Sequence, residues 1–124
     1  MRDLPDDLID LTVTSPPYDG VRTYDLLPLP KFKQVANELF RITKPGGVVA
    51  WIVQEQIKNG SQSGTSSEQR LYFRDIGFLL WDRIMMARFG RISPLSGHYG
   101  LPVEEAFILT TVPLRLCSPA ATHC

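Results

Sequence analysis

A short apolar run that ends on two prolines constrains the fold more than any other feature. Residues 8–14 (Leu-Ile-Asp-Leu-Thr-Val-Thr) predict a buried strand. Pro16 and Pro17 end it, because proline fixes φ and lacks a backbone N–H, while their carbonyls can still accept hydrogen bonds. Ser15 precedes them and Tyr18 follows. Two interpretations are open: a plain strand end with a rigid turn, or a ligand-binding corner at the carboxyl end of a strand.

Length and composition limit the class of protein. A chain of 124 residues, 44% hydrophobic and 21% charged, is typical of one soluble globular domain. No apolar run is long enough to cross a bilayer, so we expect no membrane partner. The first seven residues are acidic and do not resemble a signal peptide, so we expect a cytoplasmic protein.

Charge is balanced overall but unevenly spread. A formal net charge of zero argues against a free-standing nucleic-acid binder, because neutralising phosphates supplies most non-specific affinity. Residues 70–91 nevertheless contain five arginines, against Asp75 and Asp82. This stretch could contact phosphate, but we favour a solvated mixed surface.

The two cysteines lie close together near the end of the sequence. Cys117 and Cys124 flank no other cysteine, and only His123 adjoins them. Their spacing matches no zinc pattern, and two cysteines make no disulfide framework. We therefore expect free thiols on a flexible tail over residues 114–124 and no metal site.

The clearest helix follows a proline-containing loop. Apolar residues at helical spacing form one stripe, made of Phe32, Val35, Ala36, Leu39 and Phe40. Residues 44–47 (Lys-Pro-Gly-Gly) should end this helix, with glycine as a left-handed cap. The continuous apolar run 48–53 then predicts a strand covered on both faces. Strand, helix and strand together predict a right-handed parallel crossover.

A second helix is expected after a polar segment. Residues 54–65 are rich in Gly, Ser and Gln and predict a flexible loop. Ser66 and Gln69 have the spacing of a capping box. The helix that they would begin should run to about Ile76 and end at Gly77.

Two further strands complete the expected sheet. Residues 78–87 and 106–112 are apolar runs, separated by a loop at 88–102 that is rich in Gly, Ser and Pro. The spacing leaves no room for a helix between these runs. We therefore expect the two strands to be antiparallel neighbours.

Taken in order, these motifs resemble the amino-methyltransferases of DNA. The Ser-Pro-Pro-Tyr of residues 15–18, the Lys-Pro-Gly-Gly of 44–47 and the Asp-Ile-Gly-Phe of 75–78 carry the resemblance, which covers residues 4–112. Enzymes of this family methylate cytosine N4 or adenine N6 with S-adenosylmethionine, as in restriction-modification. The resemblance implies an α/β, partial Rossmann-like methyltransferase fold. It would have about four strands, mostly parallel with the last antiparallel, and two main helices over a catalytic-half domain at residues 1–113.

The resemblance also implies a site. Ser15, Pro16, Pro17 and Tyr18 match the catalytic motif, and Thr14 with Ser15 would form part of the cofactor site. Ser15 Oγ and the Pro16 carbonyl would accept the two N–H bonds of a flipped base, and Tyr18 would stack on it. Serine at the first position favours cytosine without excluding adenine.

A second implication is that the site is incomplete. The family holds its cofactor with a Phe-x-Gly-x-Gly loop and an acidic residue, and the sequence contains no such loop. We therefore expect no activity from the isolated chain. DNA would be its substrate, and its first strand would be an exposed edge for a homodimer or for a second chain that supplies the cofactor half. The alternatives are a non-catalytic relic that acts as a dimeric or partner-binding module, and a plain α/β domain.

Overall fold

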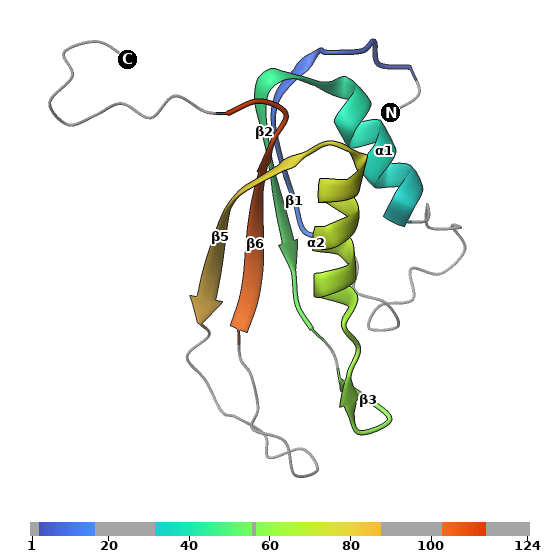
Figure 1. The fold of residues 1–124 in the computed structure, drawn as a ribbon, viewed down its shortest axis with the longest axis vertical. Coiled ribbons are helices and arrows are strands. Elements are labelled where there is room, and N and C mark those ends of the chain that lie inside the picture. Colours follow the sequence, from blue (N-terminus) through green and yellow to red (C-terminus); the bar gives the residue numbers. More distant parts are fainter. Residues whose placement is uncertain (1–2, 17–31, 56, 88–102, 114–124) are drawn as a thin grey trace, which may run out of the picture.

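Four strands form a mixed sheet, and the two helices lie on the same side of it (Figure 1). The computed structural model describes residues 3–16, 32–55, 57–87 and 103–113. Its elements are β1 (Ile9–Thr14), α1 (Phe32–Ile42), β2 (Thr43–Val53), β3 (Ile57–Lys58), β4 (Ser61–Gln62), α2 (Thr65–Ile76), β5 (Leu79–Ala87) and β6 (Val103–Thr110).

The sheet has the order β1-β2-β6-β5. β1 and β2 are parallel, and β6 is antiparallel to both of its neighbours. Three strands therefore run one way and the last strand runs the other way between β2 and β5, which confirms the expected strand number and directions. The expected antiparallel pairing of the last two strands is also confirmed, although β6 begins at Val103 and not at Ala106.

Most of the helix stripe packs as predicted, although Phe40 is exposed, and the helix ends early. Ala36, Leu39 and Ile42 are buried, and α1 stops at Ile42. The expected stop at Lys-Pro-Gly-Gly is wrong: residues 44–47 belong to β2, because β1 already pairs with this strand at Thr43. Gly46 does have a positive φ of 83°, but inside the strand and not as a helix cap.

β2 is covered on one face by described residues, not on both. Val49, Trp51 and Val53 are buried against the helices, while the alternate residues Val48 and Ala50 are only half-buried. This difference could not be predicted, because a continuous apolar run looks the same whichever molecule covers it. Strand pairing places several apolar side chains on the same uncovered side, which we call the open face: Leu11, Val13, Val48, Ala50, Ile52, Ile84 and Ile108.

Aromatic rings dominate the core between the sheet and the helices. Phe73 is fully buried, with its ring centroid 5.1 Å from that of Trp51 and 5.6 Å from that of Phe78, both edge to face. Phe32 of α1 packs on the same ring at 5.3 Å. This geometry adds to the stabilisation from burial alone, and it joins both helices to β2.

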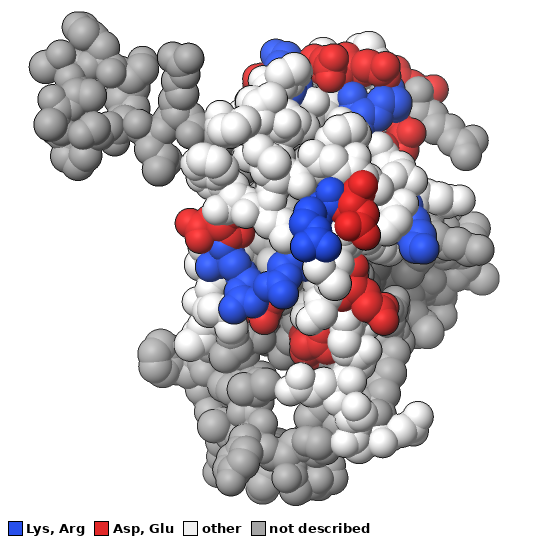
Figure 2. Space-filling model, in the orientation of Figure 1, with Lys and Arg blue, Asp and Glu red and all other residues white. Residues whose placement is uncertain are grey.

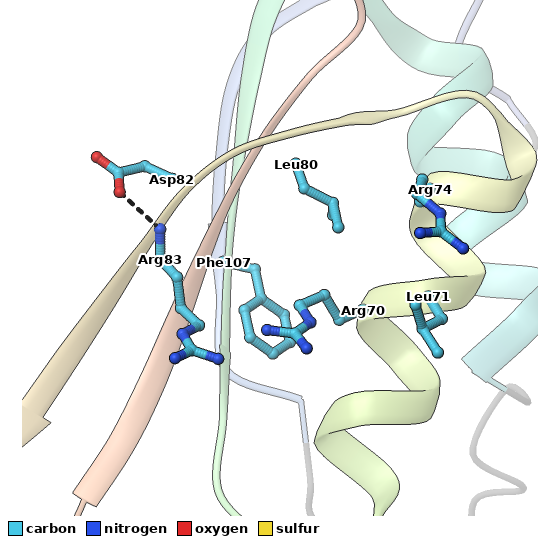
Figure 3. Close-up of a pocket in the computed structure, with 7 residues that line it drawn as sticks. All are labelled: Arg70, Leu71, Arg74, Leu80, Asp82, Arg83 and Phe107. Atoms are coloured by element: carbon cyan, nitrogen blue, oxygen red, sulfur yellow. Dashed lines mark hydrogen bonds between the residues drawn. The ribbon is translucent and has the colours of Figure 1, made fainter.

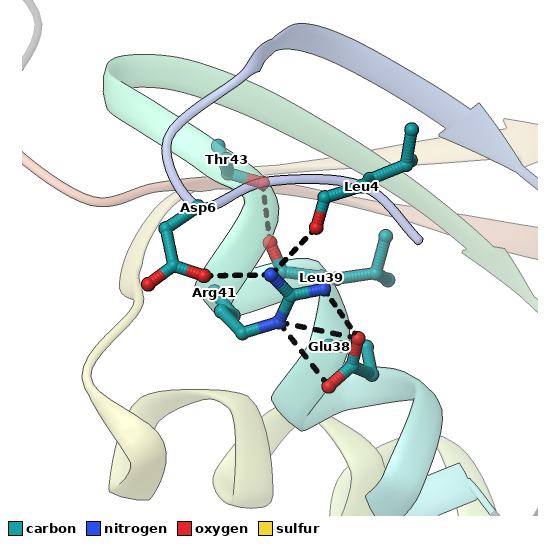
Figure 4. A network of polar contacts seen from close by, with 6 residues as sticks. All are labelled: Leu4, Asp6, Glu38, Leu39, Arg41 and Thr43. Carbon is teal, nitrogen blue, oxygen red and sulfur yellow. Dashed lines mark hydrogen bonds and ion pairs between the residues drawn. The ribbon is translucent and has the colours of Figure 1, made fainter. Parts of the chain in front are cut away.

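A polar network fixes the segment before β1 to the end of α1 (Figure 4). The Arg41 guanidinium donates to the Leu4 carbonyl at 2.8 Å and forms ion pairs with Asp6 at 2.6 Å and Glu38 at 2.8 Å. The hydrogen bonds that Arg41 donates to Glu38, and then to Asp6, raise the pKa of Arg41 above its usual value. The network sets the point at which the chain enters β1.

The segment between β2 and α2 is ordered by a hairpin and is not a featureless loop. β3 and β4 pair antiparallel around Asn59 and Gly60, whose φ angles are 52° and 75°. Two successive positive φ values define a type I′ turn, for which Asn-Gly is the preferred sequence. The expected loop thus contains a hairpin, and the Asn-Gly pair was the signal that could have predicted it.

Candidate functional site at the carboxyl edge of the parallel strands

The predicted corner lies where two parallel strands end together. Thr14, the last residue of β1, pairs with Trp51 of β2, so Ser15 and Pro16 leave the sheet beside the end of β2. Thr14 and Pro16 are half-buried and Ser15 is exposed. Open α/β sheets bind ligands at this edge. Pro17 and Tyr18 lie outside the described residues, as do Cys117, His123 and Cys124.

Glu55, just after β2, organises the other side of this edge. Its carboxylate accepts hydrogen bonds from the Ser66 hydroxyl (2.5 Å), the Ser66 backbone N–H (2.8 Å), the Gly64 N–H (2.9 Å) and the Ser63 hydroxyl (2.9 Å). Burial alone would raise the pKa of Glu55. The hydrogen bonds, led by those from Ser66, outweigh it and lower that pKa below its usual value.

This carboxylate replaces the capping box that the sequence suggested. The residue before α2, Gly64, is left-handed and offers no side chain, and Gln69 accepts a hydrogen bond from the Trp51 indole N–H at 2.9 Å instead. Glu55 thus satisfies N–H groups that begin α2 and places negative charge at the positive end of the helix. Sequence reasoning missed Glu55, because it lies 11 residues from Ser66 and local cap patterns do not reach that far.

The described residues do not form a complete cofactor site. Their glycines, Gly46, Gly47, Gly60, Gly64 and Gly77, lie in β2, in the hairpin and at the ends of α2, and none belongs to a Phe-x-Gly-x-Gly loop. Within the same ranges, no three His, Cys, Asp or Glu side chains gather as metal ligands. The described part of this edge therefore offers hydrogen-bond acceptors but no cradle for the methionine part of a cofactor.

Strand order, strand directions and the position of this edge define part of a Rossmann-like methyltransferase fold. The chain is similar to the orphan methyltransferase M.BamHII of Bacillus amyloliquefaciens, to which it is 42% identical over 102 residues. The match covers 82% of this chain but 38% of that protein. No family model matches the sequence.

Solved structures show the same fold. TTHA0409 of Thermus thermophilus, assigned as a DNA modification methylase and complexed with S-adenosyl-L-methionine, superposes with a TM-score of 0.69 at 18% identity. The PvuII DNA methyltransferase, which is cytosine-N4-specific, superposes with 0.66 at 15% identity. These matches cover 95% and 90% of this chain, but 54% and 45% of the two proteins. The chain thus spans about half of their length.

A helix that crosses a membrane must be long and apolar. Neither α1 nor α2, the two helices in the described part of the chain, is long and apolar enough to span a bilayer.

Proposed function

We propose that this chain is the catalytic half of a DNA amino-methyltransferase that acts on cytosine N4 or adenine N6. The observation that carries the proposal is the place of Ser15 and Pro16. In a chain that is similar to an orphan methyltransferase, these residues follow β1 at the edge where open α/β sheets bind ligands. Residues 1–113 would form this catalytic-half domain, and residues 114–124 a flexible tail.

Ser15 and Pro16 are suited to activating an amino group. The lone pair of an exocyclic amino nitrogen is delocalised into the base, which makes the nitrogen a poor nucleophile. The Ser15 hydroxyl oxygen and the Pro16 carbonyl would each accept a hydrogen bond from one of its two N–H groups. This would draw the nitrogen toward tetrahedral geometry and free the lone pair. Pro17 would stiffen the corner, and Tyr18 would stack on the flipped base. The serine favours cytosine as the target.

S-adenosylmethionine is the proposed methyl donor, and it supplies an activated methyl group on a sulfonium. Thr14 and Ser15 would contact part of it. The described residues lack a glycine-rich loop, so we assign the remainder of the cofactor site to a second polypeptide that carries the cofactor half of the fold.

The sheet supports this assignment. β1 is an edge strand, and Leu11 and Val13 are 61% and 63% exposed, a large apolar area to leave in water on a strand. Since the chain spans 38% of M.BamHII, the occupant that fits is the missing remainder of that fold. It would supply a strand beside β1 and a layer over the open face. A second copy of this chain is the competing occupant.

Calorimetry tests the function. S-adenosylmethionine should bind this chain only when a polypeptide bearing the cofactor half is present, and the pair should methylate duplex DNA. Ser15→Ala should reduce methylation about a hundredfold, the size expected for losing one positioned hydrogen-bonding group. Ser61→Ala, on the exposed strand β4, is the matched control and should leave the rate unchanged.

Two outcomes would overturn parts of this proposal. No cofactor binding or methylation with the partner present would contradict the enzyme assignment and leave the partner-binding module. Cofactor binding by this chain alone would contradict the assignment of the missing half to a second polypeptide.

A further inference from the structure

A hollow of about 300 Å³ lies between α2 and β5, away from the edge where β1 and β2 end. Three arginines reach it from the two elements: Arg70 and Arg74 from α2, and Arg83 from β5 (Figure 3). Its other lining residues are Leu71, Leu80, Asp82 and Phe107.

Local structure explains why the arginines gather. Arg70 and Arg74 are four residues apart on α2 and so share one face of the helix. On β5, the pairing register shifts between Leu80 and Asp82. Because an extra residue reverses the alternation of faces, Arg83 pairs with Phe107 on the helix side, and Asp82 pairs with Ile108 on the other side.

The result is a separation of charge across the sheet. In Figure 3 the Arg83 guanidinium points into the hollow, while the Asp82 side chain points away from it. The Asp82 carboxylate instead accepts the Arg83 backbone N–H at 2.8 Å. The hollow therefore contains guanidinium groups. Asp82 also lines it, but the Asp82 carboxylate points away from the hollow.

These positive charges have little compensation. Arg74 meets Asp75 at 3.7 Å, but both side chains are more than 60% exposed, so this pair contributes little. In the described ranges, no carboxylate lies within 4.0 Å of the Arg70 or Arg83 guanidinium. Figure 2 shows a row of basic side chains across this face, with acidic side chains beside it and a further acidic group at the N-terminal end.

We propose that this hollow binds a phosphate group. The guanidinium fork matches phosphate oxygens geometrically, and three arginines from two elements can surround one group or follow a chain of them. Leu71 and Leu80 add apolar contact area beside the guanidinium groups. The phosphate could belong to a polynucleotide backbone or to a small free phosphate. The phosphate site itself does not depend on the proposed function. The identification of the polynucleotide as DNA does.

Anisotropy of a labelled 12-base-pair duplex tests the site across a salt series. The double variant Arg70→Gln/Arg83→Gln should bind about tenfold more weakly at low salt. It should also lower the slope of log K against log salt by about two, because two guanidinium groups no longer neutralise phosphates. Lys33→Gln removes an exposed cation from α1 and is the matched control, expected to leave the slope unchanged.

Competition with inorganic phosphate identifies the source. Duplex binding that millimolar phosphate displaces in the wild type but not in the double variant supports the site with a polynucleotide ligand. Calorimetric binding of inorganic phosphate without duplex binding supports it with a small phosphate. An unchanged affinity and slope in a folded double variant, or binding of neither ligand by the wild type, would overturn it. Neither assay needs methylation, so a failure of the proposed function would appear separately.

Discussion

Glu55 shows how one side chain can fix the geometry of a site from outside the helix that it caps. It leaves the sheet at the end of β2 and accepts four hydrogen bonds, two of them from backbone N–H groups at the start of α2. Because the same edge carries Ser15 and Pro16, the start of α2 and the proposed base-holding corner are set by neighbouring strand ends. A change at Glu55 should therefore disturb the helix first.

Glu55→Gln should lower the free energy of unfolding at pH 7 by about 1–2 kcal/mol, the usual loss for a charged helix cap. The folded pKa of Glu55 lies below its unfolded value of 4.5. Its contribution is thus complete above pH 4.5 and is lost as the pH falls through the folded pKa. Urea unfolding between pH 3 and 7 should show less pH dependence in the variant.

Glu68→Gln is the control for this prediction, since Glu68 is also acidic and lies in the first turn of α2 but is exposed. Its loss should cost only a few tenths of a kcal/mol from the helix dipole. Equal losses in the two variants would mean that charge near the helix end matters and that the specific hydrogen bonds of Glu55 do not.

At the scale of helices and strands, the sequence predicted the features that depend on local patterns, but not those that depend on contacts between distant residues. Most of the α1 stripe and the end of α2 at Gly77 followed from periodicity and glycine chemistry, and these are confirmed, except that Phe40 is exposed. The end of α1 could not be predicted in the same way, because the pairing of Ile9 with Thr43 overrides the Lys-Pro-Gly-Gly signal. The Glu55 cap and the register shift in β5 depend on residues distant in sequence, which no local pattern contains. For the candidate site, the structure locates Ser15 and Pro16, while Pro17 and Tyr18 remain predictions.

Phe73→Ala should weaken the packing of α2 against the sheet. This ring is fully buried and contacts Phe32, Trp51 and Phe78, so its loss should cost about 3–5 kcal/mol. Leu71→Ala, on the same helix but 43% exposed, should cost under about 1 kcal/mol. Chemical denaturation of both variants checks the difference. Similar losses would show that α2 is not held by this aromatic cluster.

Over the whole molecule, the dominant feature is a sheet covered on one side by the described residues. If a second polypeptide covers the open face, Val13→Lys should reduce its association at least tenfold, since it places a charge in an apolar interface. Met85→Lys is the control: Met85 is 52% exposed on a strand but, by its pairing with Glu105, lies on the helix side. Sedimentation velocity measures both.

Two results would count against this interface as proposed. A wild-type chain that is monomeric with and without a cofactor-half polypeptide would contradict it. Self-association that Val13→Lys abolishes, without any binding to the cofactor half, would instead identify a second copy as the occupant.

The central position of β6 has a consequence for how the chain acquires its structure. β6 is the last described strand in sequence, yet it lies between β2 and β5 and is the strand to which β5 is hydrogen-bonded. During synthesis, β2 and β5 would leave the ribosome with these edges unpaired until β6 follows. The pairing of Val49 with Leu109 then closes a separation of 60 residues, a contact that is slow to form. The nascent chain should therefore depend on chaperones until β6 is inserted.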